Sequence, residues 1–191
     1  MGTRIQADVQ GQSIGDVKMI NKILVTHASR SGSTAEIASA IGKSLCTGGT
    51  PVDVLSMMEV KDISGYQAVV AGSAIRNRAW LPEAVEFIET HRAELSKKPF
   101  ATFTVCITLA MSNSEQYRRA VSDWIQPVRT QVPSVSEGLF AGRLDFNKLP
   151  LNWDTLKLRT VVALGVFPKE DRRDWKAIAA WAESVRPLLQ A

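Results

Sequence analysis

The chain has 191 residues, of which 45% are hydrophobic and 22% charged, so its length and composition are those of one globular domain rather than of a disordered chain. The longest uninterrupted apolar run, residues 161–167, is too short to span a bilayer, which takes about 18 residues or more. A formal net charge of +4 favours an anionic ligand or surface. The lysines and arginines are scattered along the chain, which argues against nucleic acid as a partner.

The cysteines and the N-terminal residues give information on the cellular compartment of the protein. Cys46 and Cys106 are far apart and have no metal-ligand spacing around them, so we expect two buried thiols and no metal site. Unpaired thiols fit a reducing cytoplasm. Residues 1–20 lack the apolar core and cleavage site of a secretory signal, and we expect them to form a disordered arm or leader. The sequence therefore predicts a cytoplasmic domain over residues 21–191.

Strand patterns recur at regular intervals from residue 22 onward. Short runs of β-branched and apolar residues predict strands at 22–27, 52–55, 67–72, 100–108 and, more weakly, 135–144. The runs are bounded by glycine-, serine- or proline-containing turns. Their composition is typical of strands that are buried on both faces of a parallel sheet.

Helical periodicity fills the intervals between these strands. One helix is expected from Ser33 to the Gly48-Gly49 pair, and a second begins near Pro82. A continuous apolar stripe over residues 117–128 predicts a third helix. A last helix is predicted over residues 171–189, with the Trp175 side chain buried. Ser33 with Glu36, and Ser112 with Glu115, have the spacing of a capping box.

Five strands that alternate with helices predict an α/β fold, a doubly wound five-stranded parallel sheet with helices on both faces. In such sheets, ligands bind beyond the carboxyl ends of the strands, at the point where the strand order reverses. The loop after the first strand is therefore the first place where we expect a binding site.

That loop reads Ser29-Arg30-Ser31-Gly32-Ser33-Thr34, with hydroxyls at four of its six positions. Together with the amides and the positive dipole end of the next helix, these hydroxyls can hold a phosphate dianion. The loop lacks both the Gly-Lys-Ser/Thr of a P-loop and the Gly-x-Gly-x-x-Gly of a dinucleotide site. A loop of this kind without lysine suits a terminal monophosphate such as that of FMN. The alternative is an ordinary strand-to-helix turn with a good cap.

The loop resembles the phosphate loop of the flavodoxin family, Thr/Ser-x-Thr/Ser-Gly-x-Thr, at Ser29, Ser31, Gly32 and Thr34. Residues 72–76, residues 140–144 and an Asp-x-x-Asp-Trp motif from Asp171 are similar to the quinone-dependent protoporphyrinogen oxidase branch of these FMN-binding proteins. The resemblance implies a flavodoxin-like fold, FMN as cofactor, and two more loops that hold the isoalloxazine ring. The residues implied are Ser73, Ala74, Ile75, Arg76, Asn77 and Trp80 after the third strand, and Thr108, Leu109, Ala110 and Met111 after the fourth.

Several of these residues have a second interpretation. Arg76 and Arg78 are either solvated surface charges or cations that face the ring and stabilise its anionic reduced form. Trp80 either stacks on the ring or packs on the next helix. This chain also departs from the branch after Arg76, where residues 77–80 stand in place of the expected aromatic residue and histidines. His27 and His91 are isolated and receive no role.

Residues 147–169 form an insertion before the last helix that combines Trp153 and an apolar run with nearby lysines and an arginine. It is either an amphipathic stretch that rests on an anionic membrane, or a loop that covers one edge of the sheet. The first interpretation would place the protein at the inner face of the membrane, where it would meet a quinone.

The resemblance implies an FMN-dependent oxidoreductase that passes electrons from a reduced substrate, such as a tetrapyrrole precursor, through FMN to a quinone. The flavin carries the chemistry, so no catalytic side chain is predicted. Two alternatives are a flavodoxin-type electron shuttle that serves a redox partner protein and a flavin-free regulatory domain on the same fold. Whether the chain forms a homo-oligomer is left open.

Overall fold

The computed structural model describes residues 22–47, 49–111, 114–143 and 171–190. The arm predicted over residues 1–20 and the insertion predicted over residues 147–169, with its proposed membrane contact, lie outside the described residues.

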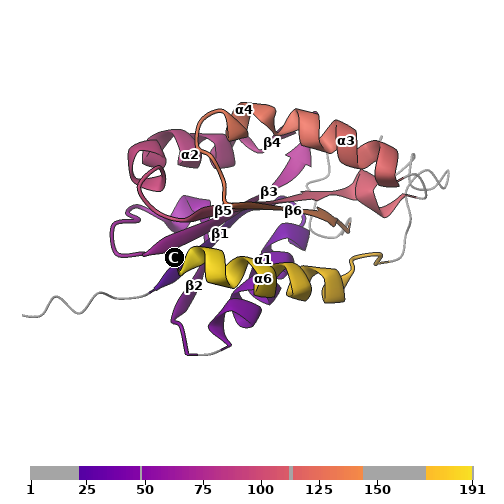
Figure 1. Cartoon of the computed structure of the whole chain (residues 1–191). Coiled ribbons are helices and arrows are strands. Elements are labelled where there is room, and N and C mark those ends of the chain that lie inside the picture. Colours follow the sequence, from indigo (N-terminus) through magenta and orange to yellow (C-terminus); the bar gives the residue numbers. More distant parts are fainter. Residues whose placement is uncertain (1–21, 48, 112–113, 144–170, 191) are drawn as a thin grey trace, which may run out of the picture.

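A single twisted sheet runs through the described chain, with helices packed on both of its faces (Figure 1). Its strands are parallel in the order β2-β1-β3-β5-β6, and a short β4 pairs antiparallel with the end of β3. The predicted doubly wound α/β fold is therefore confirmed. The strands are β1 (Ile23–Ala28), β2 (Val52–Ser56), β3 (Ala68–Arg76), β4 (Ala79–Trp80), β5 (Phe100–Cys106) and β6 (Ser136–Ala141).

The helices divide between the two faces of the sheet (Figure 1). One face carries α1 (Ser33–Cys46) and α6 (Trp175–Leu189), and the other carries α2 (Pro82–Leu95), α3 (Ser114–Trp124) and α4 (Gln126–Arg129). Single 3₁₀ turns, η1 (Met57–Glu59) and η2 (Ile107–Ala110), follow β2 and β5.

The central strand β1 shows why the sequence folds in this way. Ile23 and Val25 pack on the α1 and α6 side, whereas Leu24 and Ala28 pack on the α2 side. Because successive strand residues point to opposite faces, a strand covered on both sides must be apolar at nearly every position. The apolar run that predicted this strand is thus explained by its position in the middle of the sheet, where helices cover both faces.

Some boundaries differ from the prediction. The strand β3 continues to Arg76, and β5 ends at Cys106, where η2 begins. The stripe predicted as one helix over residues 117–128 is broken at Ile125, because Pro127 in the first turn of α4 cannot continue the hydrogen-bonding ladder of α3. The strand predicted over residues 135–144 is shorter in the structure, where β6 spans Ser136–Ala141. Val135, just before it, is exposed.

Two predicted burials are wrong. The helix α6 begins at Trp175, with Asp174 as its cap, and the Trp175 side chain is 42% exposed instead of buried. Cys46 is exposed, whereas Cys106 is buried as predicted. Cys46 directly follows Leu45, which belongs to the buried stripe of α1, and one helical step turns the next side chain by about 100° toward solvent.

The strand order places the point of reversal between β1 and β3. The chain leaves β1 for β2 on one side and returns to β3 on the other. The carboxyl ends of β1, β3 and β5 lie along one edge of the sheet, so the loop after β1, the β3–β4 hairpin and the η2 turn all gather there. This is the edge at which doubly wound sheets bind ligands.

Gly72 on β3 allows the close packing beneath this edge. A Cβ at this position would lie 2.0 Å from Cζ of the Phe103 ring. We expect Gly72→Ala to lower the free energy of unfolding by about 2 kcal/mol, because the packed core must shift to accept a methyl group. Gly65→Ala is the matched control, since a Cβ there meets nothing within 4 Å. Denaturant unfolding measures both, and equal midpoints for Gly72→Ala and the parent would contradict this packing.

Candidate functional site

The loop between β1 and α1 turns through a left-handed residue. Gly32, the N-cap of α1, has φ 88° and ψ −17°, a conformation that only glycine adopts without a steric penalty. Its N–H donates to Ser29 Oγ at 3.1 Å, and its carbonyl accepts from the Glu36 N–H at 3.0 Å. The first amides of α1 lie beyond the reach of intrahelical acceptors, so they remain available for an anion at this end.

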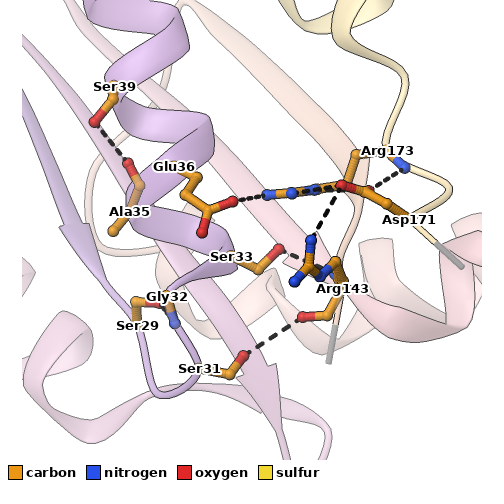
Figure 2. Close-up of polar contacts among 10 residues, drawn as sticks. All are labelled: Ser29, Ser31, Gly32, Ser33, Ala35, Glu36, Ser39, Arg143, Asp171 and Arg173. Carbon is orange, nitrogen blue, oxygen red and sulfur yellow. Dashed lines mark hydrogen bonds and ion pairs between the residues drawn. The ribbon is translucent and has the colours of Figure 1, made fainter. Parts of the chain in front are cut away.

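The predicted capping box between Ser33 and Glu36 is wrong. Gly32, not Ser33, is the N-cap of α1, and no side chain caps the helix. Ser33 Oγ instead accepts from the Arg143 N–H at 3.0 Å, and the Glu36 carboxylate accepts from Arg173 at 2.6 Å (Figure 2). Both side chains therefore accept hydrogen bonds from residues more than a hundred positions away in the sequence.

The hydroxyl groups of the loop are oriented by backbone groups. Ser29 and Ser33 each accept from a backbone N–H, which leaves their hydroxyl protons able to donate. Ser31 Oγ lies 3.5 Å from the Arg143 carbonyl oxygen, at the limit of a hydrogen bond. Thr34 is 1% exposed, so its side chain is buried. Arg30 is exposed and Ser29, Ser31 and Gly32 are half-buried, whereas Ser33 and Thr34 are buried.

A cluster of charged side chains lies beside this loop, on α1 and before α6 (Figure 2). Arg173 donates to both oxygens of Asp171, at 2.8 and 2.6 Å, and to Glu36 at 2.6 Å. Arg143 Nη1 lies 3.8 Å from Asp171 Oδ2. The hydrogen bonds from Arg173, with its charge and that of Arg143, lower the pKa of Asp171 from 3.8 to about 2.

Arg30 does not face into the loop. Both terminal nitrogens of its guanidinium bind the Glu83 carboxylate in the first turn of α2, with Nη2 to Oε2 at 2.7 Å. The residue was predicted to bind the cofactor, and the structure shows it linking the loop to α2. The β1–α1 loop is thus attached to helices on both faces of the sheet.

The β3–β4 hairpin forms the second part of the edge. Ser73 at its base is fully buried, and its hydroxyl accepts from the Leu81 N–H at 3.0 Å and donates to the Ala74 carbonyl at 2.9 Å. Asn77 and Arg78 at the tip have φ of 52° and 61°. Positive φ at both central residues is the pattern of a type I′ turn, whose twist matches that of the paired strands. Arg76, Asn77 and Arg78 are exposed.

Trp80 supports the hairpin from below. Its side chain is 4% exposed and its Nε1–H donates to Thr104 Oγ1 on β5 at 2.9 Å. The indole packs in the cluster that includes Leu81 and Phe87 of the α2 region. This arrangement fits the packing alternative, so we do not keep Trp80 among the proposed ring contacts.

The η2 turn after β5 forms the third part. Thr108 Oγ1 lies 3.1 Å from Cys106 Sγ, and the Thr108 carbonyl accepts from the Met111 N–H at 3.1 Å. Leu109 and Ala110 are buried, whereas Thr108 and Met111 are half-buried. Of the four predicted residues, Thr108 and Met111 therefore have the more accessible side chains.

Sequence reasoning missed the charged cluster as a part of the site. The motifs at residues 140–144 and at Asp171 indicated a family resemblance, but nothing in them predicted a role for Arg143 or Arg173. The only available signal was that two charged motifs flank the long segment between β6 and α6.

Fold and site together define a flavodoxin-like α/β protein with a left-handed turn and free helix amides at the switch point of its sheet. Residues 24–166 match the model of the flavodoxin domain family. The protoporphyrinogen IX dehydrogenase [quinone] of Escherichia coli strain K12 is 30% identical over 182 residues, which cover 87% of this chain and 96% of that protein. The chain therefore belongs to the flavodoxin domain family, as its phosphate-loop motif implied.

Solved structures agree on the fold. A flavodoxin from Streptococcus pneumonia TIGR4 has a TM-score of 0.53 at 18% identity, over 87% of this chain and 98% of its own. A cysteine-to-serine mutant of a Pseudomonas aeruginosa flavodoxin has a TM-score of 0.52 at 13% identity, over 89% of this chain and 99% of its own. No helix in the described part of the chain has the length and apolar character needed to cross a bilayer.

We expect Asp171→Asn to destabilise the protein at neutral pH by more than about 1 kcal/mol, because the Arg173 side chain, 3% exposed, loses its bidentate partner. The pKa of Asp171 in the folded state, about 2, lies below its ordinary value of 3.8, so this stabilisation is present above about pH 5 and lost as pH falls toward 2. Urea unfolding should show the gap between parent and variant closing over that range.

The exposed Asp123 on α3 supplies the control. Asp123→Asn should change stability by less than about 0.5 kcal/mol at either end of the pH range. A gap for Asp171→Asn that stays constant down to pH 2 would show that the carboxylate is not held ionised by Arg173.

Proposed function

We propose that the protein binds FMN along the carboxyl edge of β1, β3 and β5, and that it is an oxidoreductase passing electrons from a reduced substrate to a quinone. The observation that carries the proposal is the left-handed turn at Gly32, which joins hydroxyl donors to the first amides of α1. A dianionic phosphate is the ligand group that such a donor set suits best.

The residues present fit FMN. Ser29 and Ser31 offer hydroxyls, and the amides that follow Gly32 offer N–H groups, without a lysine among them. A phosphate monoester carries about −1.5 to −2 charges at neutral pH, which matches a helix N-terminus. The β3–β4 hairpin and the η2 turn lie on the same edge and would hold the ring, with contacts from residues 74–77 and from Thr108 and Met111.

When bound, FMN would supply the electron and hydride chemistry. The chain itself would bind and orient the group and set its electrostatic surroundings. Arg76 and Arg78, exposed on the hairpin, would place positive charge beside the ring, and this favours a ring that gains negative charge. The buried hydroxyl of Ser73, which bonds to Leu81 and Ala74, would keep the base of the hairpin in one place.

The quinone half of the proposal rests on the 30% identical Escherichia coli relative, whose name states a protoporphyrinogen IX substrate and a quinone. The chain matches that relative over 96% of its length, so the similarity is not confined to the phosphate loop. Protoporphyrinogen or another reduced tetrapyrrole is accordingly the substrate class that we propose. The positive net charge of +4 also fits an anionic substrate.

Binding is tested first with Gly32→Val. We expect the parent protein to bind FMN at least tenfold (about 1.4 kcal/mol) more tightly than riboflavin, and Gly32→Val to abolish FMN binding, because a β-branched residue resists the left-handed turn and crowds the phosphate. Quenching of flavin fluorescence measures both. Gly49→Val is the matched control, because Gly49 also has a positive φ, 90°, but lies after α1 with nothing within 4 Å of an added Cβ. Equal affinity for riboflavin and FMN would defeat the phosphate assignment.

Electron transfer is tested by reducing the reconstituted flavoprotein without oxygen and mixing it with a water-soluble quinone. We expect reoxidation at a rate on the order of 1–10 per second, as for an ordinary enzyme step. Free reduced FMN at the same concentration gives the background rate. Reoxidation by quinone no faster than this background, with fast reoxidation by a one-electron protein acceptor, would instead identify a flavodoxin-type shuttle.

A further inference from the structure

Arg173 is the most deeply buried cation beside the phosphate loop. Its side chain is 3% exposed, and its guanidinium lies over the Trp175 ring, 4.4 Å from the centroid. Its Nε and Nη2 donate to Asp171, and its Nη1 donates to Glu36. Because all three nitrogens already bind carboxylates, Arg173 is not placed to contact a ligand itself.

One of these carboxylates bears directly on the loop. Glu36 lies in the first turn of α1, the helix whose amides face the proposed phosphate. A carboxylate there stabilises the helix dipole, but it also repels an anion at the same end. Figure 2 shows the Glu36 side chain directed to Arg173 and not toward Ser29.

The cluster and the loop also share backbone contacts. The Arg143 N–H donates to Ser33 Oγ in the first turn of α1, and the Arg143 side chain lies 3.8 Å from Asp171. Asp171 in turn holds Arg173 through two hydrogen bonds. The positions of Ser33 and Glu36 are therefore set by one connected group of charges (Figure 2).

We propose that Arg173 is a positioning residue that gives the loop its preference for a phosphate-bearing flavin. By placing a buried positive charge against Glu36 and Asp171, it offsets their repulsion of the dianion and keeps Glu36 turned away from the loop. The inference rests on the proposed function, because it needs a phosphate ester in the loop. It assigns the discrimination between FMN and riboflavin partly to a residue that touches neither.

The test compares the dissociation constants of FMN and riboflavin for each variant at low ionic strength. We expect Arg173→Gln to raise the Kd of FMN about tenfold and to change that of riboflavin less than about twofold, because only FMN carries the dianion. Adding Glu36→Gln to Arg173→Gln should recover most of the FMN affinity, since the added substitution removes the repelling charge. Raising the salt concentration should shrink the effect of Arg173→Gln.

Arg129→Gln is the control for loss of an ion pair away from the loop; the Arg129 and Glu137 side chains are 28% and 24% exposed. Arg129 binds Glu137 with Nη2 to Oε2 at 2.5 Å, on the opposite face of the sheet, so this variant should lower thermal stability and leave the FMN to riboflavin ratio unchanged. Arg173→Lys, which keeps the charge but not the bidentate geometry, should retain most of the preference for FMN.

Two results would overturn the proposal: an unchanged ratio of FMN to riboflavin affinity in Arg173→Gln, whether or not both affinities fall, or no recovery of FMN affinity in the double variant. If Arg173→Gln does not fold, Glu36→Gln alone decides, because removing the negative charge should hold or raise the preference for FMN, and a fall would contradict the inference. A parent protein that does not prefer FMN to riboflavin would defeat the proposed function instead, so the two failures are distinguishable.

Discussion

The left-handed turn at Gly32 is the constraint on which the site depends. Only four residues separate the end of β1 from the start of α1, and the chain must reverse from a buried strand into a helix that packs on the same sheet. A residue with φ of 88° makes this possible within so short a loop. The same turn leaves the amides of the first turn of α1 at the point where the strand order reverses. The packing of α1 and the proposed anion binding therefore depend on one backbone conformation.

Contacts from both faces of the sheet hold this turn in place. Arg30 attaches it to Glu83 at the start of α2, and Arg143 and Arg173 attach the first turn of α1 to the region before α6. A loop fixed in this way loses little conformational entropy when a ligand binds, so more of the interaction energy appears as affinity. An arginine also contacts the other end of α1, where Arg186 of α6 donates to the Ser44 carbonyl.

Local patterns were enough to predict the fold, and they also located the loop of the candidate site. Apolar runs located the strands, and the loop motif at Ser29 identified the turn, because both depend on neighbouring residues. The partner of a polar side chain depends on tertiary structure instead. Ser33 and Glu36 have ideal spacing for a capping box, yet their partners are Arg143 and Arg173, 110 and 137 positions away. The local pattern gives no information on which of these competing contacts prevails.

The two sides of the proposed site use charge in different ways. On the phosphate side, backbone dipoles and the buried Arg173 act from fixed positions that water screens only weakly. On the ring side, the cations are exposed at the tip of a hairpin that holds Arg78 at φ 61°, at a cost of about 1–2 kcal/mol for a residue with a Cβ. Exposed charges are screened beyond about 8 Å at physiological ionic strength. In the proposed site, the phosphate side would therefore contribute affinity, whereas the hairpin would act only on charge that develops close to its tip.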